Sequence, residues 1–501
     1  MRNNEKMHNK KIPYLTASLP ILFLVILLVT NVTIYDNAIG GANQVSLIFS
    51  AALATIIGMH NGSKWGEVIQ GITDNIKSIV PAIIMLLLIG SLTGTWLISG
   101  VIPTMIYYGL QLLNPKIFLF ATAIITAIVS LATGSSWSTI ATLGIALLGI
   151  GTAIGLPLGL IGGAIISGAY FGDKMSPLSE TTNMAAAIGQ VDLFRHIKYM
   201  MYTTIPSFII TLILFLVIGF YFKTDISQEQ ITNALSIISD KFVINIWLFL
   251  VPILVITMII KNIPAIPALF IGSLLGGVFA IIFQPDIIIE ISGKSTNNIN
   301  ANYIAIMNAM IGEINFIDLN QSINNIFDVA EADRSDLLRS GGMLGMMNTL
   351  LLIFCAMIFS GSIESTGILK RIAEPIVKYA QNTGSLITTT ASTCIFFNIT
   401  TSDQYMSIVV PGRMFAKSYK EKGLAAENLS RTLEDSGTVT SVLIPWNSCG
   451  ATQSAVLGVA TLTYLPFCFF NLISPLMTIA YAYLNVKIKK TERKKLTKQL
   501  L

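Results

Sequence analysis

The stretch FGDKMSPLSETTN, residues 171–183, follows directly on the apolar segment LPLGLIGGAIISGAYF, residues 156–171. It places an aspartate, a lysine and a glutamate, with hydroxyl side chains and a proline, where a membrane helix would be expected to continue. Pro177 has no backbone N–H and disfavours helix at Ser176. A helix break with free backbone carbonyls is therefore predicted here, with Asp173 beside it.

The remainder of the chain is typical of an all-α polytopic membrane protein. Of its 501 residues, 53% are hydrophobic and only 11% are charged, against about 25% charged in soluble proteins. Several apolar runs approach or exceed the roughly 20 residues that span a bilayer, among them 15–35, 208–222 and 267–283. Backbone groups in lipid must bond within their own segment, which favours helices.

Loop charges predict the topology, because Lys and Arg are enriched in cytoplasmic loops. Both termini are basic, and the net charge of +5 comes largely from them, whereas 285–340 holds eight acidic and three basic residues. We therefore expect the termini in the cytoplasm, 285–340 outside and an even number of crossings. The expected crossings are 14–35, 42–60, 78–99, 156–190, 202–222, 242–260, 264–284, 343–362, 432–460 and 462–485.

Two further apolar segments with polar tips, 115–150 and 385–412, each fit a re-entrant hairpin. The loop charges fit the predicted topology equally well if each of these two segments crosses the membrane twice. The first apolar run is too long for a signal peptide and lacks a small-residue cleavage site, so we interpret it as a retained span. The predicted location is the bacterial cytoplasmic membrane.

Short matches between the two halves indicate an internal repeat. GTWLISGVI (94–102) matches GSIESTGIL (361–369), and the same offset places Ser136 on Asp403. With a small slip, DKMSPLS (173–179) matches DSGTVTS (435–441). Corresponding loops differ in basic residues, so the repeats are predicted to be inverted, as in many transporters. The predicted divisions are a leading part (1–77), two transport repeats (78–222 and 343–485), a linking part with an acidic external loop (223–342) and a basic tail (486–501).

The break at 171–183 supplies the first candidate ion site. A charge at the bilayer centre costs about 2.5–3.5 kcal/mol, so it normally faces a cavity or a partner. Asp173 is the first choice, since its expected repeat partner is also an aspartate; a structural ion pair with Lys174 is the alternative. The residues predicted to bind ion or substrate here are Asp173, Ser176, Ser179 and Asn183.

Acid, hydroxyls, glycine and proline again interrupt an apolar span in LEDSGTVTSVLIPWNSCGATQS, residues 433–454. Oxygen ligands of this kind suit hard cations such as Na⁺, although hydroxyls also bond back to helix carbonyls. Asp173 and Asp435 are therefore the two predicted Na⁺ ligands, whereas Glu434 is expected at the cytoplasmic surface. The candidates in this stretch are Asp435, Thr438, Ser441 and Asn447.

The hairpin tips, GSSWST (134–139) and NITTSDQY (398–405), each begin a new helical run after a hydroxyl cluster. Helix N-termini there would attract an anion, and preceding carbonyls would suit a cation. Asp403 is either a helix cap or a site carboxylate; Glu364 is a weaker candidate, and Trp137 and Trp446 either wall a cavity or pack in the core. The candidates at the tips are Ser135, Ser136, Thr401, Ser402 and Asp403.

These residues predict a secondary transporter rather than an enzyme. Neither a catalytic constellation nor a phosphate-binding glycine loop nor metal-ligand spacing of the four cysteines is present in the sequence. No cofactor and no nucleic acid are expected; Na⁺ is the transported ion, and a homodimer remains open. A buried carboxylate is neutralised by either a proton or Na⁺, so a carrier that reorients only when neutralised exchanges the two. Two acids would permit more than one H⁺ per Na⁺, with the exchange driven by voltage at about 2.3 kcal/mol per charge per 100 mV.

GDKMSPLSETTN, GSSWST and EDSGTVTSVLIPWNSCGA closely resemble signature stretches of the NhaC family of bacterial Na⁺/H⁺ antiporters. The resemblance covers residues from about 60 to 485 and implies inverted repeats with re-entrant hairpins. Glu180 stands where aspartate is common in the family, which keeps the charge. The family also contains malate/lactate antiporters and amino-acid carriers, so the resemblance supports Na⁺ coupling more strongly than the absence of an organic substrate.

Two functions therefore remain open at this point. The first is an electrogenic Na⁺/H⁺ antiporter; the second is a Na⁺-coupled carrier of a small carboxylate or an amino acid, with the substrate carboxylate at the hairpin tips. No arginine lies in the core of the motifs, which favours ions alone. A channel or a membrane enzyme fits the paired broken helices less well.

Overall fold

The structure is a computed structural model that describes residues 12–34, 41–112, 114–221, 227–261, 263–327, 338–377 and 381–491. Within these ranges, eight helices are long and apolar enough to cross a membrane, or up to ten spans exist if each of two bent helix pairs is one span. The prediction of an all-α polytopic membrane protein is thus confirmed. The basic residues of the two tails beyond these ranges, and Lys378, on which the topology prediction also drew, lie outside the described residues.

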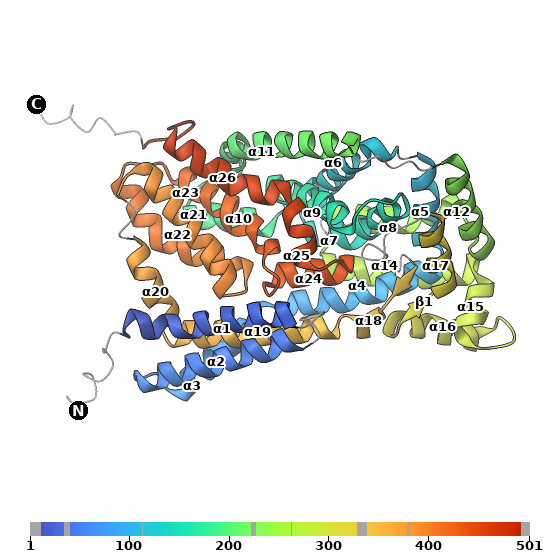
Figure 1. Ribbon diagram of the computed structural model, residues 1–501, viewed down its shortest axis with the longest axis horizontal. Coiled ribbons are helices and arrows are strands. Elements are labelled where there is room, and N and C mark those ends of the chain that lie inside the picture. The colour runs from blue at the N-terminus through green and yellow to red at the C-terminus, as the bar shows by residue number, and fades with distance from the viewer. Residues whose placement is uncertain are drawn as a thin grey trace, which may run out of the picture.

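The leading helices form a layer with a helix from the second half of the chain. Figure 1 shows the first three helices lying alongside α19 (Met347–Ser365), at the lower edge of the view. The helices before the first hairpin are α1 (Tyr14–Ile34), α2 (Ala42–His60), α3 (Trp65–Ser78), α4 (Val80–Ile98) and α5 (Val101–Leu112).

The first hairpin and the first broken helix follow. The second limb of the hairpin starts as a short helix and passes through a π-helical turn, η3 (Ile140–Gly144). The elements of this region are α6 (Pro115–Thr133), α7 (Ser136–Thr139), α8 (Ile145–Ala153), the broken helix α9 (Leu158–Met175) and α10 (Glu180–Gly189), and α11 (Leu193–Tyr221).

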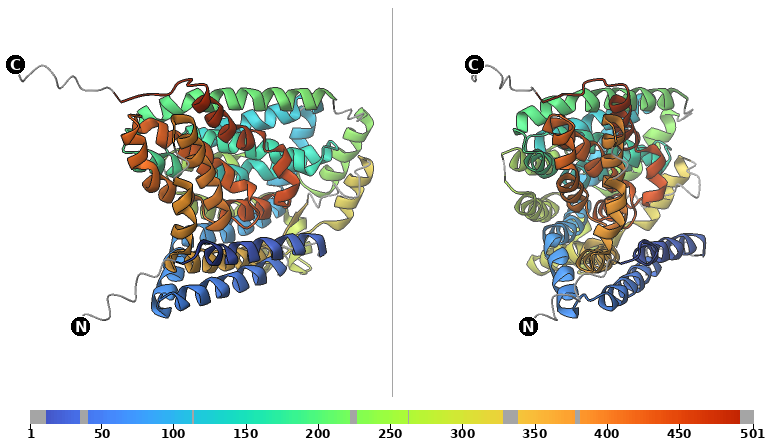
Figure 2. Two further views of the ribbon diagram at one scale, coloured as in Figure 1. Left: turned by 60° about the vertical axis from the view of Figure 1, so that its left-hand side comes forward. Right: turned by 90° about the vertical axis from the view of Figure 1, so that its left-hand side faces the viewer.

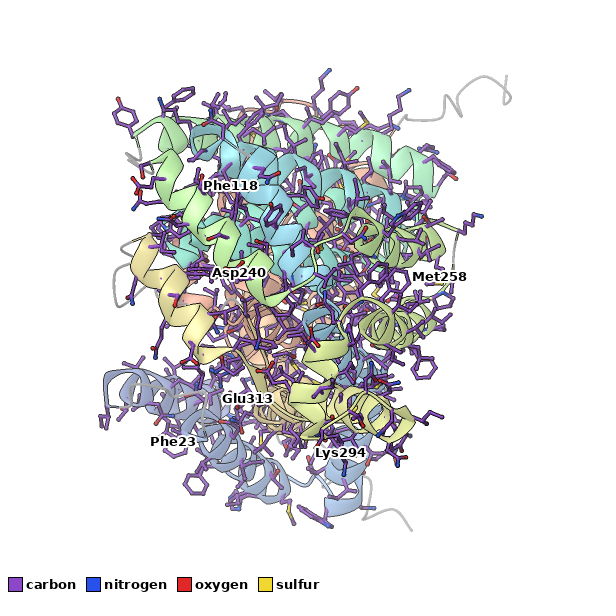
Figure 3. All side chains as sticks on the ribbon, turned by 90° about the vertical axis from the view of Figure 1, so that its right-hand side faces the viewer. Phe23, Phe118, Asp240, Met258, Lys294 and Glu313 are labelled. Atoms are coloured by element: carbon purple, nitrogen blue, oxygen red, sulfur yellow. The ribbon has the colours of Figure 1, made fainter. Side chains whose placement is uncertain are left out.

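The linking region ends in an ordered cap. Helices α12 and α13 are bent by 85° at a short break, so α12 does not continue the span. Figure 3 views the end of the molecule that carries the cap, where Asp240, Lys294 and Glu313 are labelled. The elements are α12 (Gln228–Lys241), the 3₁₀ turn η4 (Ile246–Phe249), α13 (Leu250–Ile260), α14 (Ala265–Phe283), α15 (Pro285–Ser292), α16 (Ile299–Ile311), β1 (Ile314–Asn315), α17 (Ile317–Ile326), β2 (Arg339–Ser340) and α18 (Gly342–Gly345), with β1 and β2 antiparallel.

The second half contains a second hairpin and a second broken helix. Its broken helix passes through a π-helical turn, η6 (Glu434–Thr438), and a 3₁₀ turn, η7 (Ser441–Leu443). The other elements after α19 are α20 (Ile368–Val377), α21 (Thr383–Thr400), α22 (Gln404–Glu421), α23 (Ala426–Leu433), α24 (Ser448–Leu457), α25 (Thr461–Tyr464), the 3₁₀ turn η8 (Leu465–Phe467) and α26 (Phe469–Tyr483).

The two halves share one order of elements: hairpin, broken helix, closing helix. In each half, side chains cap both the helix after the hairpin tip and the helix after the break, and the cap pairs Ser135/Asp403 and Ser179/Asn447 share one sequence offset. This offset corrects two predicted pairings. Ser135, not Ser136, matches Asp403, and Asp435 lies in the π-helical turn well before its break rather than at the position of Asp173.

The two ends of the described chain lie toward the same end of the long axis. In Figure 1, α1 begins and α26 ends at the same end of the long axis, and the cap of α15, α16 and α17 lies at the opposite end. This arrangement agrees with an even number of crossings. The side on which the termini lie, and whether the hairpins re-enter or cross, stay predictions; both limbs of the first hairpin are long and apolar enough to cross.

Small residues bring α9 close to α6. A Cβ on Gly168 would lie 2.1 Å from the carbonyl oxygen of Ala123, and one on Gly172 would lie 2.3 Å from that of Ala127. Small residues four apart permit this close approach between membrane helices. The last turn of α9 consequently lies against the tip of the first hairpin, which sets the position of Asp173.

Candidate ion-binding site

A cavity of about 700 Å³ lies where the two hairpin tips meet. Its walls come from both tips, from the starts of α10 and α24, and from the junctions of α3 with α4 and of α13 with α14. Four of the predicted site residues line it: Ser135, Asp173, Ser179 and Asp403. The other predicted residues do not, namely Ser136, Ser176, Asn183, Thr401, Ser402, Asp435, Thr438, Ser441 and Asn447.

Asp173 lies at the edge of this cavity, in the last turn of α9, and is 9% exposed. One carboxylate oxygen, Oδ2, accepts hydrogen bonds from the backbone N–H of Ser136 at 3.1 Å and from its hydroxyl at 2.7 Å. Ser136 therefore contributes by fixing Asp173, although it does not line the cavity itself. Among the described residues no hydrogen bond of good geometry reaches the other oxygen, Oδ1, although the Ser179 hydroxyl lies close enough to the carboxylate to interact with it.

The first break has the local structure that its sequence predicts. Ser176 ends α9 with extended backbone, as expected before Pro177, and the Ser179 side chain caps α10 by accepting from Thr182. The expected free carbonyls are partly occupied, however. The amide of Asn183 donates to the carbonyls of Pro177 at 2.9 Å and of Ser179 at 2.7 Å, which uses one lone pair of each oxygen.

Asp403 is a helix cap, as one of its two predicted roles required, and its role as a site carboxylate stays a prediction. Its Oδ1 accepts from the backbone N–H of Met406 at 2.8 Å and so caps α22, while the side chain also lines the cavity. The preceding Ser402 has a positive φ of 57°, and its carbonyl accepts from the N–H of Ser448 at 2.8 Å. The tip of the second hairpin thereby rests on the start of α24.

A contact across the cavity joins the two halves. The hydroxyl of Tyr405, in the first turn of α22, donates to Glu180 Oε2 at 2.7 Å. Both residues line the cavity, as does Trp137 of the first tip. Glu180 therefore adds a third carboxylate to the lining, beside those of Asp173 and Asp403.

Asp435 is held away from this cavity by an ion pair. Lys174, the residue after Asp173, forms a salt bridge with Asp435, and both side chains are fully buried. Asp435 also accepts hydrogen bonds from Thr203 at 2.8 Å and from Thr478, and Lys174 donates to Ser474 at 3.0 Å. The alternative of a structural Asp173–Lys174 pair is thus wrong, because Lys174 pairs across the repeats.

Glu434 was expected at the surface and is instead fully buried. Neither of its carboxylate oxygens accepts a hydrogen bond among the described residues, although the Thr438 hydroxyl lies nearby. The charges that act on it include those of Lys174, Asp173 and Asp435. Sequence reasoning missed this residue because α23 is short and polar and looks like a cytoplasmic loop.

Several remaining candidates hold the second broken helix in place. Thr438 offers its carbonyl to Gln404 at 3.0 Å and to the Ser441 hydroxyl at 2.7 Å, and the Asn447 amide donates to the Asn398 carbonyl at 3.1 Å. Other candidates are hydrogen-bonded too. Thr401 donates to the Phe397 carbonyl, Ser176 accepts from the N–H of Leu178, Trp446 donates to the Ile399 carbonyl, and Glu364 accepts from the amide of the distant Asn75.

The four cysteines are free and buried, and within the described residues no group of three or more His, Cys, Asp or Glu could hold a metal ion. A Na⁺ site would therefore combine few carboxylates with hydroxyl and carbonyl oxygens.

Paired hairpins, broken helices and a carboxylate-lined cavity between them are features of secondary transporters. Residues 168–486 match the Na⁺/H⁺ antiporter family, and the chain belongs to that family. The resemblance to the NhaC family is confirmed.

Named relatives cover almost the whole chain. It is 35% identical to the Na⁺/H⁺ antiporter NhaC of Alkalihalophilus pseudofirmus, over 90% of this chain and 92% of that protein. It is 34% identical to the malate-2H⁺/Na⁺-lactate antiporter of Bacillus subtilis, over 95% and 96%. It is 33% identical to the arginine/ornithine antiporter ArcD of Halobacterium salinarum, over 94% and 92%. These near-equal identities do not favour one substrate over another. The choice of substrate has to be argued from the residues of the cavity.

Proposed function

We propose that this protein exchanges Na⁺ for H⁺ across the bacterial cytoplasmic membrane by alternating access. The observation that carries the proposal is the charge of the cavity. Among the described residues that line it, three are carboxylates, Asp173, Glu180 and Asp403, and none is Lys, Arg or His. A lining of this kind favours a cation over an anion.

In this proposal, Na⁺ binds Oδ1 of Asp173 with hydroxyl oxygens nearby. Ser135 and Ser179 line the same cavity and supply such oxygens, and Asp403 is the nearest equivalent acid of the second half. Hard oxygen ligands suit Na⁺. A proton and Na⁺ neutralise the same carboxylate, so the two compete for Asp173 and cannot be carried together.

The buried charges behind the cavity provide the coupling. Asp173, Glu434 and Asp435 place three carboxylates around one lysine, and the buried guanidinium of Arg431 lies over the Tyr199 ring instead. Excess buried negative charge is costly in a membrane, so a further cation or proton is required for neutrality. Because Lys174 adjoins Asp173 and binds Asp435, occupation of Asp173 acts directly on this pair.

Alternating access would move the hairpins against the other cavity wall. That wall consists of Ile79, Pro81, Ile259 and Pro264, among others, at the junctions of the α3–α4 and α13–α14 helices. Few polar contacts tie these apolar side chains to the tips, which suits a sliding surface.

A second candidate is a Na⁺-coupled carrier of a small carboxylate. Helices α10, α22 and α24 all begin at the cavity, and helix N-termini attract anions. The volume of about 700 Å³ also exceeds what one Na⁺ occupies and falls within the range of small-molecule sites. The three carboxylates oppose this function unless bound Na⁺ first neutralises them.

The test is proton flux in liposomes that hold the protein and an internal pH dye. Na⁺ is added outside, first alone and then with malate, lactate or amino acids, and a set membrane voltage is imposed in parallel. Na⁺ alone is expected to drive proton efflux, with a rate that depends on voltage if more than one H⁺ moves per Na⁺. A response that requires an organic solute would overturn simple Na⁺/H⁺ exchange and support the second candidate.

A further inference from the structure

A second pocket, of about 350 Å³, lies at the end of the molecule where α11 begins and α26 ends. Figure 2 shows the segment after α26 lying beside the first turns of α11. The residues that line this pocket are not among those that line the cavity between the hairpin tips. It is lined by Arg195, Lys198, Tyr199, Tyr202, Glu427, Lys487, Ile488 and Lys489.

The backbone that forms this pocket is fixed by buried hydrogen bonds. The hydroxyl oxygen of Tyr199 lies 2.5 Å from the carbonyl oxygen of Lys487 and 2.6 Å from Asn428 Oδ1, two acceptors for its single proton, and it accepts from the N–H of Lys489 at 3.1 Å. The Asn428 amide donates to the carbonyl of Lys489 at 2.7 Å. The segment after α26 is therefore held on α11 and α23, and the pocket is built into the fold.

The pocket has a strong excess of positive charge, with four cationic side chains and one carboxylate. Arg195 and Lys489 both bond to Glu427, the latter at 2.7 Å. Burial opposes ionisation of Glu427, but the bonds from Lys489 and Arg195 hold its pKa below the ordinary value. One ionised carboxylate is thus shared by two cations.

Within the part of the chain that the structure describes, the other cations form no ion pair with a carboxylate. Among the described residues, Lys198 makes no ion pair, and the Lys487 ammonium lies 4.6 Å from the centre of the Tyr202 ring. Beneath Tyr199, the fully buried guanidinium of Arg431 lies 4.7 Å from the ring centre, with Nε and Nη2 lacking hydrogen-bond partners. Unpaired cations around a fixed cavity are the complement of an anion with several acceptor oxygens.

We propose that this pocket binds the phosphate headgroup of an anionic phospholipid. The argument for a lipid rather than a free phosphate is the adjacent surface of α11, where Phe194 is 69% exposed and Ile209 is 51% exposed. Tyr202 belongs to both the pocket and this apolar face, as tyrosines at membrane interfaces do. A basic pocket that borders a lipid-facing helix holds a headgroup while the acyl chains lie along the helix.

The test is native mass spectrometry of the delipidated full-length protein in detergent, titrated with phosphatidylglycerol or with phosphatidylcholine. Phosphatidylglycerol is expected to bind in preference. Each lysine near a membrane surface contributes roughly a fivefold effect on binding of anionic lipid, so Lys198→Gln with Lys487→Gln should weaken it by about 30-fold. Both side chains are on the surface, so the double variant is expected to fold.

Lys116→Gln is the matched control, because Lys116 is exposed and lies against Gly219 at the other end of α11. It should leave the affinity unchanged. Equal binding of the two lipids, or equal weakening by the control, would overturn the proposal. Displacement of phosphatidylglycerol by inorganic phosphate would also overturn it, since that result identifies a site for free anions. None of these outcomes depends on Na⁺/H⁺ exchange.

Discussion

The two broken helices occupy equivalent places in the two halves, yet they treat their acids differently. The first ends abruptly at Ser176, and Asp173 lies in its last turn and lines the cavity. The second passes through a π-helical turn that contains Asp435, which is fully buried and paired with Lys174 of the first. Similar architecture therefore places a cavity-lining acid in one half and a buried, ion-paired acid in the other.

The difference follows from which side chains reach each carboxylate. Asp173 accepts two hydrogen bonds from Ser136 on one oxygen, and the Ser179 hydroxyl lies close to the carboxylate. Asp435 receives Lys174, Thr203 and Thr478, so both of its oxygens are occupied. A carboxylate that lies beside a cavity and accepts few hydrogen bonds can exchange ligands, whereas a fully bonded one must first lose a partner.

The largest expected effect comes from Asp173→Asn. The amide can keep a bond with Ser136 but loses the charge that attracts Na⁺. Loss of a charged ligand in a desolvated site costs on the order of 3 kcal/mol, so Na⁺ affinity should fall by about 100-fold. The measurement is the Na⁺ dependence of proton flux in liposomes, with Glu427→Gln as a control acid outside the site. Wild-type Na⁺ dependence in Asp173→Asn would remove the functional distinction between the two helices.

A double-mutant cycle on Lys174 and Asp435 tests whether the acid of the second broken helix is held by its ion pair. Either Lys174→Met or Asp435→Asn leaves a buried charge unpaired and should destabilise the protein by about 3–5 kcal/mol. The combined variant should recover the part of this loss that comes from the Lys174–Asp435 pair, while Glu434 and Asp173 remain without the lysine. Thermal unfolding in detergent measures both effects. Additive losses would show that the pair is not the interaction that holds Asp435.

A smaller effect is expected from Gly172→Ala, which tests why Asp173 lies where it does. The added Cβ would lie 2.3 Å from the Ala127 carbonyl oxygen and 2.6 Å from the Leu131 nitrogen, so α9 must shift from α6. Overpacking of this kind costs about 1–3 kcal/mol. The control is Gly66→Ala, because a Cβ at Gly66 would lie in open space. Gly155→Ala is unsuitable because the φ of Gly155 is +71°, which an alanine rarely adopts.

The Gly172→Ala variant should therefore lower the thermal midpoint and also weaken Na⁺ dependence, since the Asp173–Ser136 bond crosses the same helix interface. Reduced stability with unchanged Na⁺ dependence would contradict the view that this helix contact positions the acid.

Local sequence was sufficient for the class of fold and for much of the first site. Hydrophobic runs predicted the spanning helices, and Pro177 predicted the break at Ser176, because both signals act within a few residues. The hairpin tips were also visible, since Ser135 and Asp403 are side chains that cap helices. Four of the predicted residues line the cavity, because they lie at helix ends that local sequence marks.

Only the tertiary structure decided which side chains the buried charged residues contact. No pattern near Asp435 indicates that Lys174 is its counter-ion, and no pattern near Glu434 shows that a short polar helix lies buried among other helices. Likewise, the basic pocket depends on the segment after α26 returning to α11. These pairings join residues hundreds of positions apart, and their free energy depends on burial and geometry that exist only once the helices have packed. The sequence by itself thus determined where the helices run and break, while packing determined which charges meet.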